Sequence, residues 1–309
     1  MARIVIAEFM DAAGVARLSA AHDVLYDPRL VDDSTRLREL ARDADAFIVR
    51  NRTQVRGELL AALKRCKVIG RLGVGLDNID TKACAARGIA VIPAVGANAR
   101  SVAEYVIASA MLLLRGAYRS SDDVIAGHWP REALSDGREI GGTVLGLIGF
   151  GSIGRVTARL AQGVGMRVIA CDAMLDASDP AYVEAGVEST GLDRLLATAD
   201  VVSLHVPLLD ATRNLVDADR IAAMKPGAVL VNAARGGIVD EAALVAALKR
   251  GHLGGAALDV FAVEPLPAGN VFAGCPNLLL TPHVAGPSKE SSARISALIA
   301  DKVLEALRP

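Results

Sequence analysis

The sequence has 309 residues, of which 52% are hydrophobic, and a formal net charge of −1. A chain of this length can form two domains whose apolar cores need no disulfide or structural metal. The near-neutral charge argues against a surface that binds nucleic acids or membranes through excess charge. The longest apolar run, Tyr105–Leu114, is shorter than the ~20 residues that a membrane-spanning helix needs.

The four cysteines, Cys66, Cys84, Cys171 and Cys275, lack the C-x-x-C spacing of a zinc or redox site. We therefore expect reduced thiols and no metal site. The N-terminus lacks the basic stretch and long apolar run of a signal peptide, so we expect a cytoplasmic protein.

The first third of the sequence alternates short apolar stretches with amphipathic stretches, a pattern that predicts strands and helices in turn. The expected strands are 4–7, 46–49, 67–70 and 90–92, and the expected helices are 12–19, 57–63 and 81–87. Such alternation favours a parallel sheet with helices on both faces.

A second unit of the same kind follows. A longer helix is expected at 99–114, and the polar, glycine-rich stretch 127–142 is interpreted as a loop between two units. The alternation then restarts, with strands at 144–149, 167–171, 201–205, 228–231, 256–258 and 278–280, helices at 153–163, 192–197 and 241–250, and a last helix at 288–307. Six strands in one run are the number in a complete dinucleotide-binding fold, so we predict an α/β protein with two doubly wound parallel sheets.

A glycine-rich turn connects the first strand and helix of the second unit. Gly149, Gly151 and Gly154 form the pattern G-x-G-x-x-G directly after an apolar strand. Such a turn lets the backbone approach a pyrophosphate, which the N–H groups at the helix N-terminus bind. Asp172 ends the next strand, 18 residues after Gly154. Its carboxylate can accept hydrogen bonds from the adenosine ribose and repels a 2′-phosphate, which predicts NAD rather than NADP.

Three polar side chains, Arg235, Glu264 and His283, follow later strands of the second unit. The carboxyl ends of parallel strands meet at one edge of the sheet, where ligands of such folds bind. Oxidation of a secondary alcohol needs a base that works near neutral pH, which suits His283. Glu264 can stabilise the protonated imidazole and fix its tautomer. Arg235 can hold the carboxylate of a 2-oxo acid and polarise its carbonyl group, so the chemistry predicted is that of a 2-hydroxy acid dehydrogenase.

The first unit carries the candidate substrate determinants. Arg50 and Arg52 follow the strand at 46–49 and suggest a second anion on the substrate, such as a phosphate or sulfonate. Ordinary surface arginines are the alternative interpretation. In the turn Gly73-Val74-Gly75, the backbone N–H groups of Val74 and Gly75 can bind a carboxylate.

Seven stretches together resemble the D-isomer-specific 2-hydroxyacid dehydrogenases over essentially the whole chain. They are Gly73–Asp80, Asn98–Glu104, Gly149–Gly154, His205–Leu208, Met224–Gly237, Asp259–Leu266 and Thr281–His283. The resemblance implies an NAD-binding Rossmann domain, residues 98–286, inserted in a flavodoxin-like substrate domain of residues 1–97 and 287–309. It also implies a homodimer that uses NAD as its cofactor.

The resemblance assigns roles to individual residues as well. It implies Arg235 as the substrate anchor, His283 as the acid/base and Glu264 as the partner of that base. Besides the three glycines, the residues that it implies at the NAD site are Ser152, Ile153, Asp172, Pro207, Ala233, Asp259 and His283. His205, in an H-x-P motif beside the cofactor, carries no chemistry in this assignment.

Within the family, the segment Arg50–Thr53 and the Gly73 loop are similar to those of the phosphoglycerate dehydrogenases. The segments Glu8–Asp11, Val49–Val55 and Arg71–Gly75 are similar to those of the (S)-sulfolactate dehydrogenases. The resemblance therefore implies a substrate such as 3-phosphoglycerate or (S)-sulfolactate, with a carboxylate, a 2-hydroxyl group and a distal tetrahedral anion. Two alternatives stay open, a keto-acid reductase of the glyoxylate or hydroxypyruvate type and an NADH-sensing interaction protein. A formate dehydrogenase would carry Gln in place of Glu264.

Overall fold

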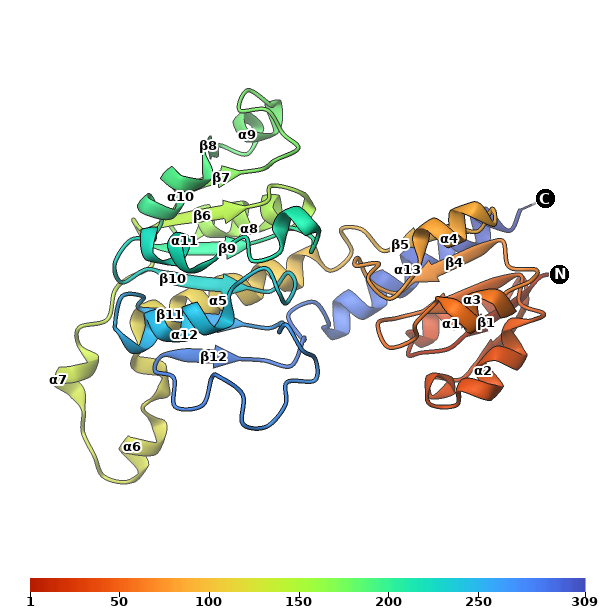
Figure 1. The fold of residues 1–309 in the computed structure, drawn as a ribbon, viewed down its shortest axis with the longest axis horizontal. Helices are drawn as coiled ribbons and strands as arrows, with labels where there is room; N and C mark the ends of the chain where they lie inside the picture. The colour runs from red at the N-terminus through yellow and green to blue at the C-terminus, as the bar shows by residue number, and fades with distance from the viewer. Residues whose placement is uncertain (309) are drawn as a thin grey trace. The chain divides into compact units, whose positions relative to one another are not determined.

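The computed structural model describes residues 1–308 and divides into two compact units. Unit 1 comprises Met1–Asn98 and the C-terminal segment that begins at Pro287, and unit 2 comprises Ala99–Gly286. The chain passes between the units twice, so unit 2 is an insertion in the sequence of unit 1 (Figure 1). In the described part of the chain, no helix combines the length and apolar character that crossing a membrane requires.

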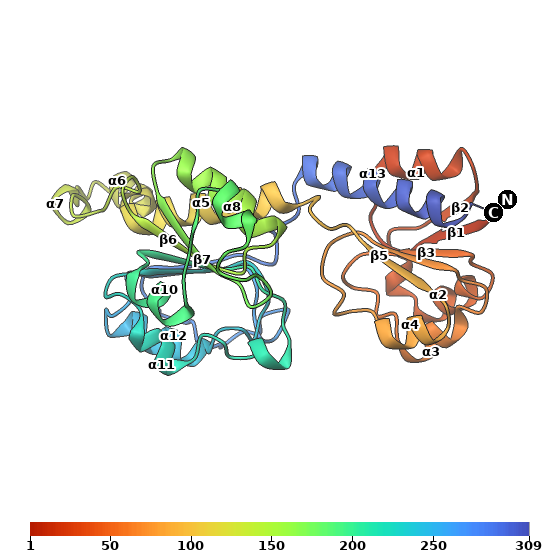
Figure 2. The same cartoon turned by 90° about the horizontal axis from the view of Figure 1, so that it is seen from above.

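Unit 1 is built on a parallel sheet with the strand order β2-β1-β3-β4-β5. The strands are β1 (Arg3–Ile6), β2 (Asp23–Tyr26), β3 (Ala46–Val49), β4 (Val68–Arg71) and β5 (Ala90–Pro93). The helices α1 (Ala12–Ser19) and α13 (Lys289–Ala306) lie on one face, and α2 (Ser34–Ala41), α3 (Gly57–Ala62) and α4 (Thr81–Ala86) lie on the other (Figure 2). A 3-10 turn, η1 (Leu30–Asp32), precedes α2. This order is that of flavodoxin-like sheets.

The C-terminal helix α13 is part of the core of unit 1. A Cβ atom at Gly70 of β4 would lie 2.7 Å from Ile299, and one at Gly14 of α1 would lie 2.9 Å from the Cβ of Ser296. The side chains of Ile299 and Val303 are fully buried against the sheet. Glycine at these two positions therefore lets α13 pack directly on β4 and α1, which closes one face of the sheet.

Unit 2 has a larger parallel sheet with the strand order β12-β11-β10-β9-β6-β7-β8. Its strands are β6 (Val144–Ile148), β7 (Arg167–Cys171), β8 (Glu188–Ser189), β9 (Val201–Leu204), β10 (Val229–Asn232), β11 (Gly255–Leu258) and β12 (Leu278–Leu280). The sheet contains one strand more than the six expected, because the two-residue β8 is too short to leave a pattern in the sequence. Two parallel α/β sheets confirm the predicted fold class. From β6 the chain adds β7 and β8 on one side, and it then continues with β9 on the other side of β6, so the strand order reverses between β6 and β9.

Helices cover both faces of the sheet in unit 2. The helices α5 (Ala99–Arg115) and α8 (Ser152–Gly163) pack on one face, and α10 (Leu192–Thr198), α11 (Ala218–Ala223) and α12 (Glu241–Lys249) pack on the other (Figure 2). The shorter α9 (Pro180–Glu184) precedes β8, and the 3-10 turn η3 (Asp210–Thr212) precedes α11. The two apolar layers are separate clusters of buried side chains, one under each group of helices.

The glycine-rich stretch 127–142 does not connect the two units, which corrects the sequence-based interpretation. It lies inside unit 2, because the preceding helix α5 already belongs to that unit. It contains α7 (Arg131–Leu134) and, together with the preceding η2 (Ala117–Arg119) and α6 (Ser121–Ile125), forms a segment at 117–142 that projects from the sheet (Figure 1). Two contacts hold the end of this segment against the rest of unit 2. A Cβ atom at Gly137 would lie 2.0 Å from the carbonyl oxygen of Arg115, and Arg138 forms an ion pair with Asp200 at 2.9 Å.

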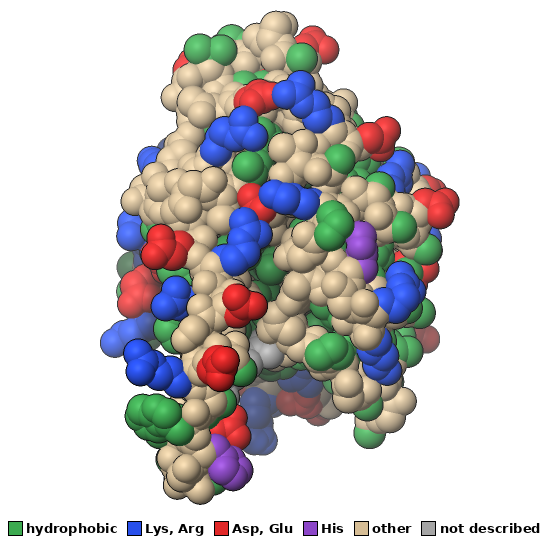
Figure 3. All heavy atoms as spheres, turned by 90° about the vertical axis from the view of Figure 1, so that its left-hand side faces the viewer, with side chains coloured by type: hydrophobic (Ala, Val, Ile, Leu, Met, Phe, Trp, Pro, Cys, Tyr) green, Lys and Arg blue, Asp and Glu red, His purple; other side chains and the backbone are tan. Residues whose placement is uncertain are grey.

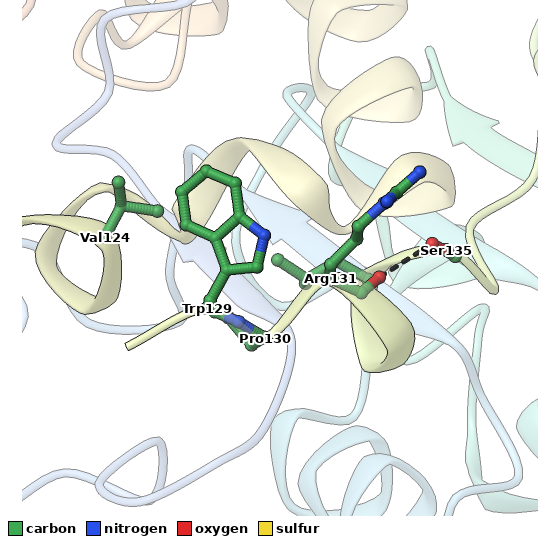
Figure 4. A pocket seen from close by; sticks show the side chains of 6 residues that line it. Val124, Trp129, Pro130, Arg131 and Ser135 are labelled. Carbon is green, nitrogen blue, oxygen red and sulfur yellow. Dashed lines mark hydrogen bonds between the residues drawn. The ribbon is translucent and has the colours of Figure 1, made fainter. Parts of the chain in front are cut away.

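The projecting segment exposes apolar side chains. A hollow on it is lined by Val124, Trp129, Pro130, Arg131, Leu134 and Ser135 (Figure 4). None of the residues predicted to bind substrate or cofactor lies in this hollow. The face of unit 2 seen in Figure 3 carries acidic and basic side chains interspersed rather than a patch of one sign.

Candidate active site

The glycine-rich turn after β6 has the geometry that a dinucleotide requires. Gly149 has a φ of +98°, and a Cβ atom there would lie 2.6 Å from the carbonyl oxygen of His205. A Cβ atom at Gly154 would lie 2.5 Å from the carbonyl oxygen of Gly149, whereas no atom lies within 4 Å of the Cβ position at Gly151. Two of the glycines therefore allow close packing of the turn, and the third leaves open space through which a pyrophosphate can approach the backbone.

The N-terminus of α8 offers hydrogen-bond donors beside this open space. No side chain caps the helix at Gly151. The backbone N–H groups of Gly151, Ser152 and Ile153 donate to no atom among residues 1–308. Unused N–H groups at the start of a helix are favourable partners for a phosphate anion, so these residues fit the pyrophosphate of NAD.

Asp172 is held directly after β7, next to the glycine-rich turn. Its Oδ2 atom accepts a hydrogen bond from the N–H of Phe150 at 2.7 Å, and its Oδ1 atom accepts one from Met174 at 2.8 Å. A carboxylate has about four acceptor positions, so two of them stay available to the hydroxyl groups of a ribose. The side chain is thus fixed in orientation and retains the capacity that the predicted role needs.

Arg235 lies in a turn after β10 that the neighbouring loop holds in place. The side-chain amide of Asn232 donates to the carbonyl oxygen of Arg235 at 2.9 Å and accepts from the N–H of Ala234 at 3.1 Å. A Cβ atom at Gly236 would lie 1.8 Å from the carbonyl oxygen of Phe261, so only glycine allows the two loops to meet here. This contact brings the turn that carries Arg235 against the loop that leads to Glu264.

His283 and Glu264 form a direct pair. The Nδ1 atom of His283 lies 2.7 Å from Oε2 of Glu264, and the side chains are 41% and 34% exposed. The N–H of Phe261 donates to the other oxygen, Oε1, at 3.0 Å. Because a carboxylate only accepts hydrogen bonds, Nδ1 carries a hydrogen, and Nε2 is the imidazole atom that gains and loses a proton.

Asp259 holds the loop that carries His283. This aspartate is 1% exposed. Its Oδ1 atom accepts from the hydroxyl of Thr281 at 2.6 Å and the N–H of Val284 at 2.8 Å, and its Oδ2 atom accepts from the N–H of Ala285 at 2.8 Å. Its carbonyl oxygen accepts from the N–H of His283 at 2.8 Å. Asp259, predicted to line the NAD site, thus also determines the backbone path on both sides of His283.

The H-x-P segment after β9 lies directly beside the glycine-rich turn, because β9 pairs with β6. Burial lowers the pKa of His205 to about 4, so its imidazole is neutral near neutral pH, and its Nε2 atom lies 3.0 Å from the hydroxyl of Ser203. Pro207 is exposed in the same segment, and Ala233 is half-buried after β10. A neutral and internally bonded His205 agrees with its having no acid/base role.

In unit 1, the segment Arg50–Thr53 after β3 is fixed by a buried carboxylate. Glu8 is 4% exposed and accepts backbone hydrogen bonds from Arg50 at 2.8 Å, Arg52 at 3.1 Å and Thr53 at 3.0 Å. The amide of Asn78 donates to the carbonyl oxygens of Arg50 at 3.1 Å and Thr53 at 2.7 Å. The loops after β1, β3 and β4 therefore form one hydrogen-bonded edge of the sheet.

The two candidate arginines on this edge differ in their surroundings. Arg52 is exposed and forms an ion pair with Asp32. The guanidinium of Arg50 lies 5.7 Å from the centre of the Phe9 ring and forms no ion pair within residues 1–308. Burial lowers its pKa, and the charge of Glu8 acts in the opposite direction. The N–H groups of Val74 and Gly75 donate to no atom of the described chain. This edge of unit 1 thus presents a guanidinium without a direct ion pair and a turn with two unused donors.

The comparisons with known proteins agree with this chemistry. Residues 107–285 match the family described as D-isomer specific 2-hydroxyacid dehydrogenase, NAD binding domain. The chain is 52% identical over 307 residues to the (S)-sulfolactate dehydrogenase of Chromohalobacter salexigens, and the alignment covers 99% of each protein. The chain belongs to the D-isomer-specific 2-hydroxyacid dehydrogenases. The predicted family, enzyme class and NAD cofactor are thereby confirmed.

Two further relatives place this dehydrogenase within its family. It is 38% identical over 306 residues to the D-3-phosphoglycerate dehydrogenase of Mycobacterium leprae, an alignment that covers 98% of this chain and 56% of that protein. Its structure matches that of a glyoxylate reductase from Paecilomyes thermophila with a TM-score of 0.85 and 29% identity, over 99% of this chain and 95% of the other.

The sequence interpretation of this dehydrogenase assigned no role to Glu8 or Asn78, although the structure makes both part of the edge of unit 1. Glu8 directly follows the predicted strand at 4–7, as candidate site residues do, and this position was the available signal. Asn78 lies in the stretch Gly73–Asp80 that carried the resemblance. Their hydrogen bonds could not be predicted, because they join residues far apart in the chain.

Proposed function

We propose that this NAD-dependent dehydrogenase transfers a hydride between NAD and C2 of a small 2-hydroxy acid that carries a distal sulfonate or phosphate. The favoured substrate is (S)-sulfolactate, and the second candidate is 3-phosphoglycerate. The observation that carries the substrate class is the partly buried guanidinium of Arg50, which forms no ion pair within residues 1–308 although the charge of Glu8 acts on it. A partly desolvated cation that forms no direct ion pair is a favourable partner for an anionic ligand. The 52% identity to a protein named (S)-sulfolactate dehydrogenase supports the choice between the two substrates.

The proton transfer is assigned to His283. Its Nδ1 atom is engaged by Glu264 at 2.7 Å, so Nε2 takes the proton of the substrate hydroxyl in oxidation and returns it in reduction. The negative charge of Glu264 stabilises the imidazolium that forms. The glycine-rich turn and Asp172 would hold NAD, which would supply the hydride acceptor for C2.

The carboxylate of the substrate is assigned to Arg235. A guanidinium binds a planar carboxylate through two parallel hydrogen bonds and stabilises negative charge on the adjacent oxygen. The turn after β10 fixes Arg235 through Asn232 at 2.9 Å. Arg50 would then bind the distal anion.

A panel of substrates tests the proposal by steady-state rates of NAD and NADP reduction. We expect kcat/KM for (S)-sulfolactate or 3-phosphoglycerate to exceed that for lactate and glycerate by at least ~10-fold, the value of one charged hydrogen bond. Because Asp172 repels a 2′-phosphate, we expect NAD to be preferred over NADP. Equal rates with glycerate would refute the distal-anion assignment, and equal use of NADP would refute the role of Asp172.

The structural match to a glyoxylate reductase supports a second candidate, a reductase of small 2-oxo acids. The same panel in the reverse direction, with NADH and glyoxylate or hydroxypyruvate, separates the two candidates. A kcat/KM for these substrates above that for the sulfonated or phosphorylated 2-oxo acids would favour the reductase.

A further inference from the structure

The loop that carries His283 has limited support from the sheet. It follows β12, a three-residue strand at the edge of the sheet that pairs only with β11. His283 itself has a φ of +57°, a backbone conformation that costs about 1 kcal/mol or more in residues other than glycine. Such a conformation persists only where neighbouring groups hold it. The contacts that hold this loop therefore decide where the imidazole lies.

A chain of side-chain hydrogen bonds supports the loop from the helical layer. The hydroxyl of Thr281 lies 2.6 Å from Oδ1 of Asp259 and 2.8 Å from the hydroxyl of Tyr105. Asp259 as a carboxylate only accepts, so Thr281 donates to it and uses its one hydrogen. Tyr105 must then donate to the oxygen of Thr281. Burial raises the pKa of Tyr105, which keeps this donor protonated.

Tyr105 belongs to α5, the helix with which the chain enters unit 2, and the loop around His283 ends at Gly286, where the chain leaves that unit. The bond between Tyr105 and Thr281 thus joins two segments 176 residues apart. This bond connects the loop that carries His283 to α5, a helix that packs against β10 and β11.

We propose that Tyr105 is a positioning residue for the acid/base His283 and acts through Thr281 and Asp259. The proposal rests on the assigned function of His283. The phenol hydroxyl directs the Thr281 hydroxyl to Asp259, and Asp259 in turn fixes the N–H groups of His283, Val284 and Ala285. Tyr105 itself has no contact with the imidazole in this assignment, so its loss affects the geometry of proton transfer and not the charge around His283.

The test combines Tyr105→Phe, Thr281→Val and the double variant, with kcat, KM for NAD and the pH dependence of kcat as readouts. We expect Tyr105→Phe to lower kcat about 3–10-fold, the effect of one hydrogen bond, with KM for NAD and the midpoint of the pH profile unchanged. Thr281→Val should lower kcat at least as much, and Thr281→Ser should restore most of the rate. In the double variant, the loss of the phenol hydroxyl should add nothing further, because the acceptor is already absent.

The control is Tyr26→Phe, which removes a hydroxyl bonded to the carbonyl oxygen of Met10 at 3.2 Å in unit 1. This variant should match Tyr105→Phe in thermal stability without the loss of kcat. Full activity of Tyr105→Phe, or additive losses in the double variant, would overturn the proposal. His283→Ala separates it from the assigned function: if that variant is inactive while Tyr105→Phe keeps full activity, only the positioning role fails.

Discussion

Replacement of His283 by alanine should lower kcat by ~10²–10⁴-fold in both directions, the usual contribution of one general acid/base. The Nε2 atom of His283 is the group to which the proton of the hydroxyl is assigned, because Nδ1 is bonded to Glu264 at 2.7 Å. Without the imidazole, water must take the proton. The glycine-rich turn at Gly149–Gly154 is unaffected, so the Kd for NAD should change little.

The measurements for this prediction are steady-state rates in both directions and a fluorescence titration with NADH. His128→Ala is the matched control, since His128 is 71% exposed and pairs with Asp123 on the projecting segment of unit 2. We expect that control to keep its activity. If His283→Ala loses less than ~10-fold, the acid/base assignment is wrong.

The second large effect is expected at Arg50. Removal of its guanidinium by Arg50→Ala should lower kcat/KM for (S)-sulfolactate or 3-phosphoglycerate by about 10–150-fold, equivalent to about 1.5–3 kcal/mol for a charged hydrogen bond. The same change should affect lactate far less, because lactate has no distal anion. The loop keeps its path, since Glu8 and Asn78 bind its backbone and not the side chain of Arg50.

Arg52→Ala is the matched control for this prediction. Arg52 differs from Arg50 by its exposure and its ion pair with Asp32. Exposed pairs of this kind contribute little to stability, and the paired guanidinium is already neutralised. We expect a change below ~3-fold for both substrate classes. Equal losses in the two variants would show that the structure does not distinguish the arginines, and unchanged kinetics in both would remove the distal-anion site.

Much of the fold could be predicted because strands in buried parallel sheets are short apolar runs between helices. The strand β3, buried along its whole length, is of this kind. The edge strand β2 was missed, because Asp23 and Tyr26 at its two ends are exposed and its pattern is that of a loop. The stretch 127–142 was placed wrongly between the units, since composition indicates a loop but not which domain contains it.

The residues of the candidate site could be predicted from the sequence, but their contacts could not. Arg235, Glu264 and His283 could be selected because each follows a strand, and strand ends of a parallel sheet lie at one edge. The contacts that hold them could not be predicted. Gly236 against Phe261 and Tyr105 against Thr281 join segments whose proximity depends on the complete packing of unit 2. The different surroundings of Arg50 and Arg52 likewise depend on Phe9 and Asp32, which no local pattern connects to them.

The central claim is that His283 carries the proton and that the charge of Glu264 stabilises the protonated imidazole. The most direct measurement is kcat against pH in both directions for the wild type and Glu264→Gln. His205 does not contribute to these profiles near neutral pH, because burial lowers its pKa to about 4. In the wild type, oxidation should gain rate as pH rises and reduction should lose rate, since the base must be neutral in one direction and protonated in the other.

The Gln variant keeps the shape of the side chain and removes its charge, so the imidazolium is less stabilised. Both profiles should then move to lower pH, with KM for NAD unchanged. Profiles of the variant that coincide with those of the wild type would contradict the account, because Glu264 would then hold His283 in place without acting on its proton.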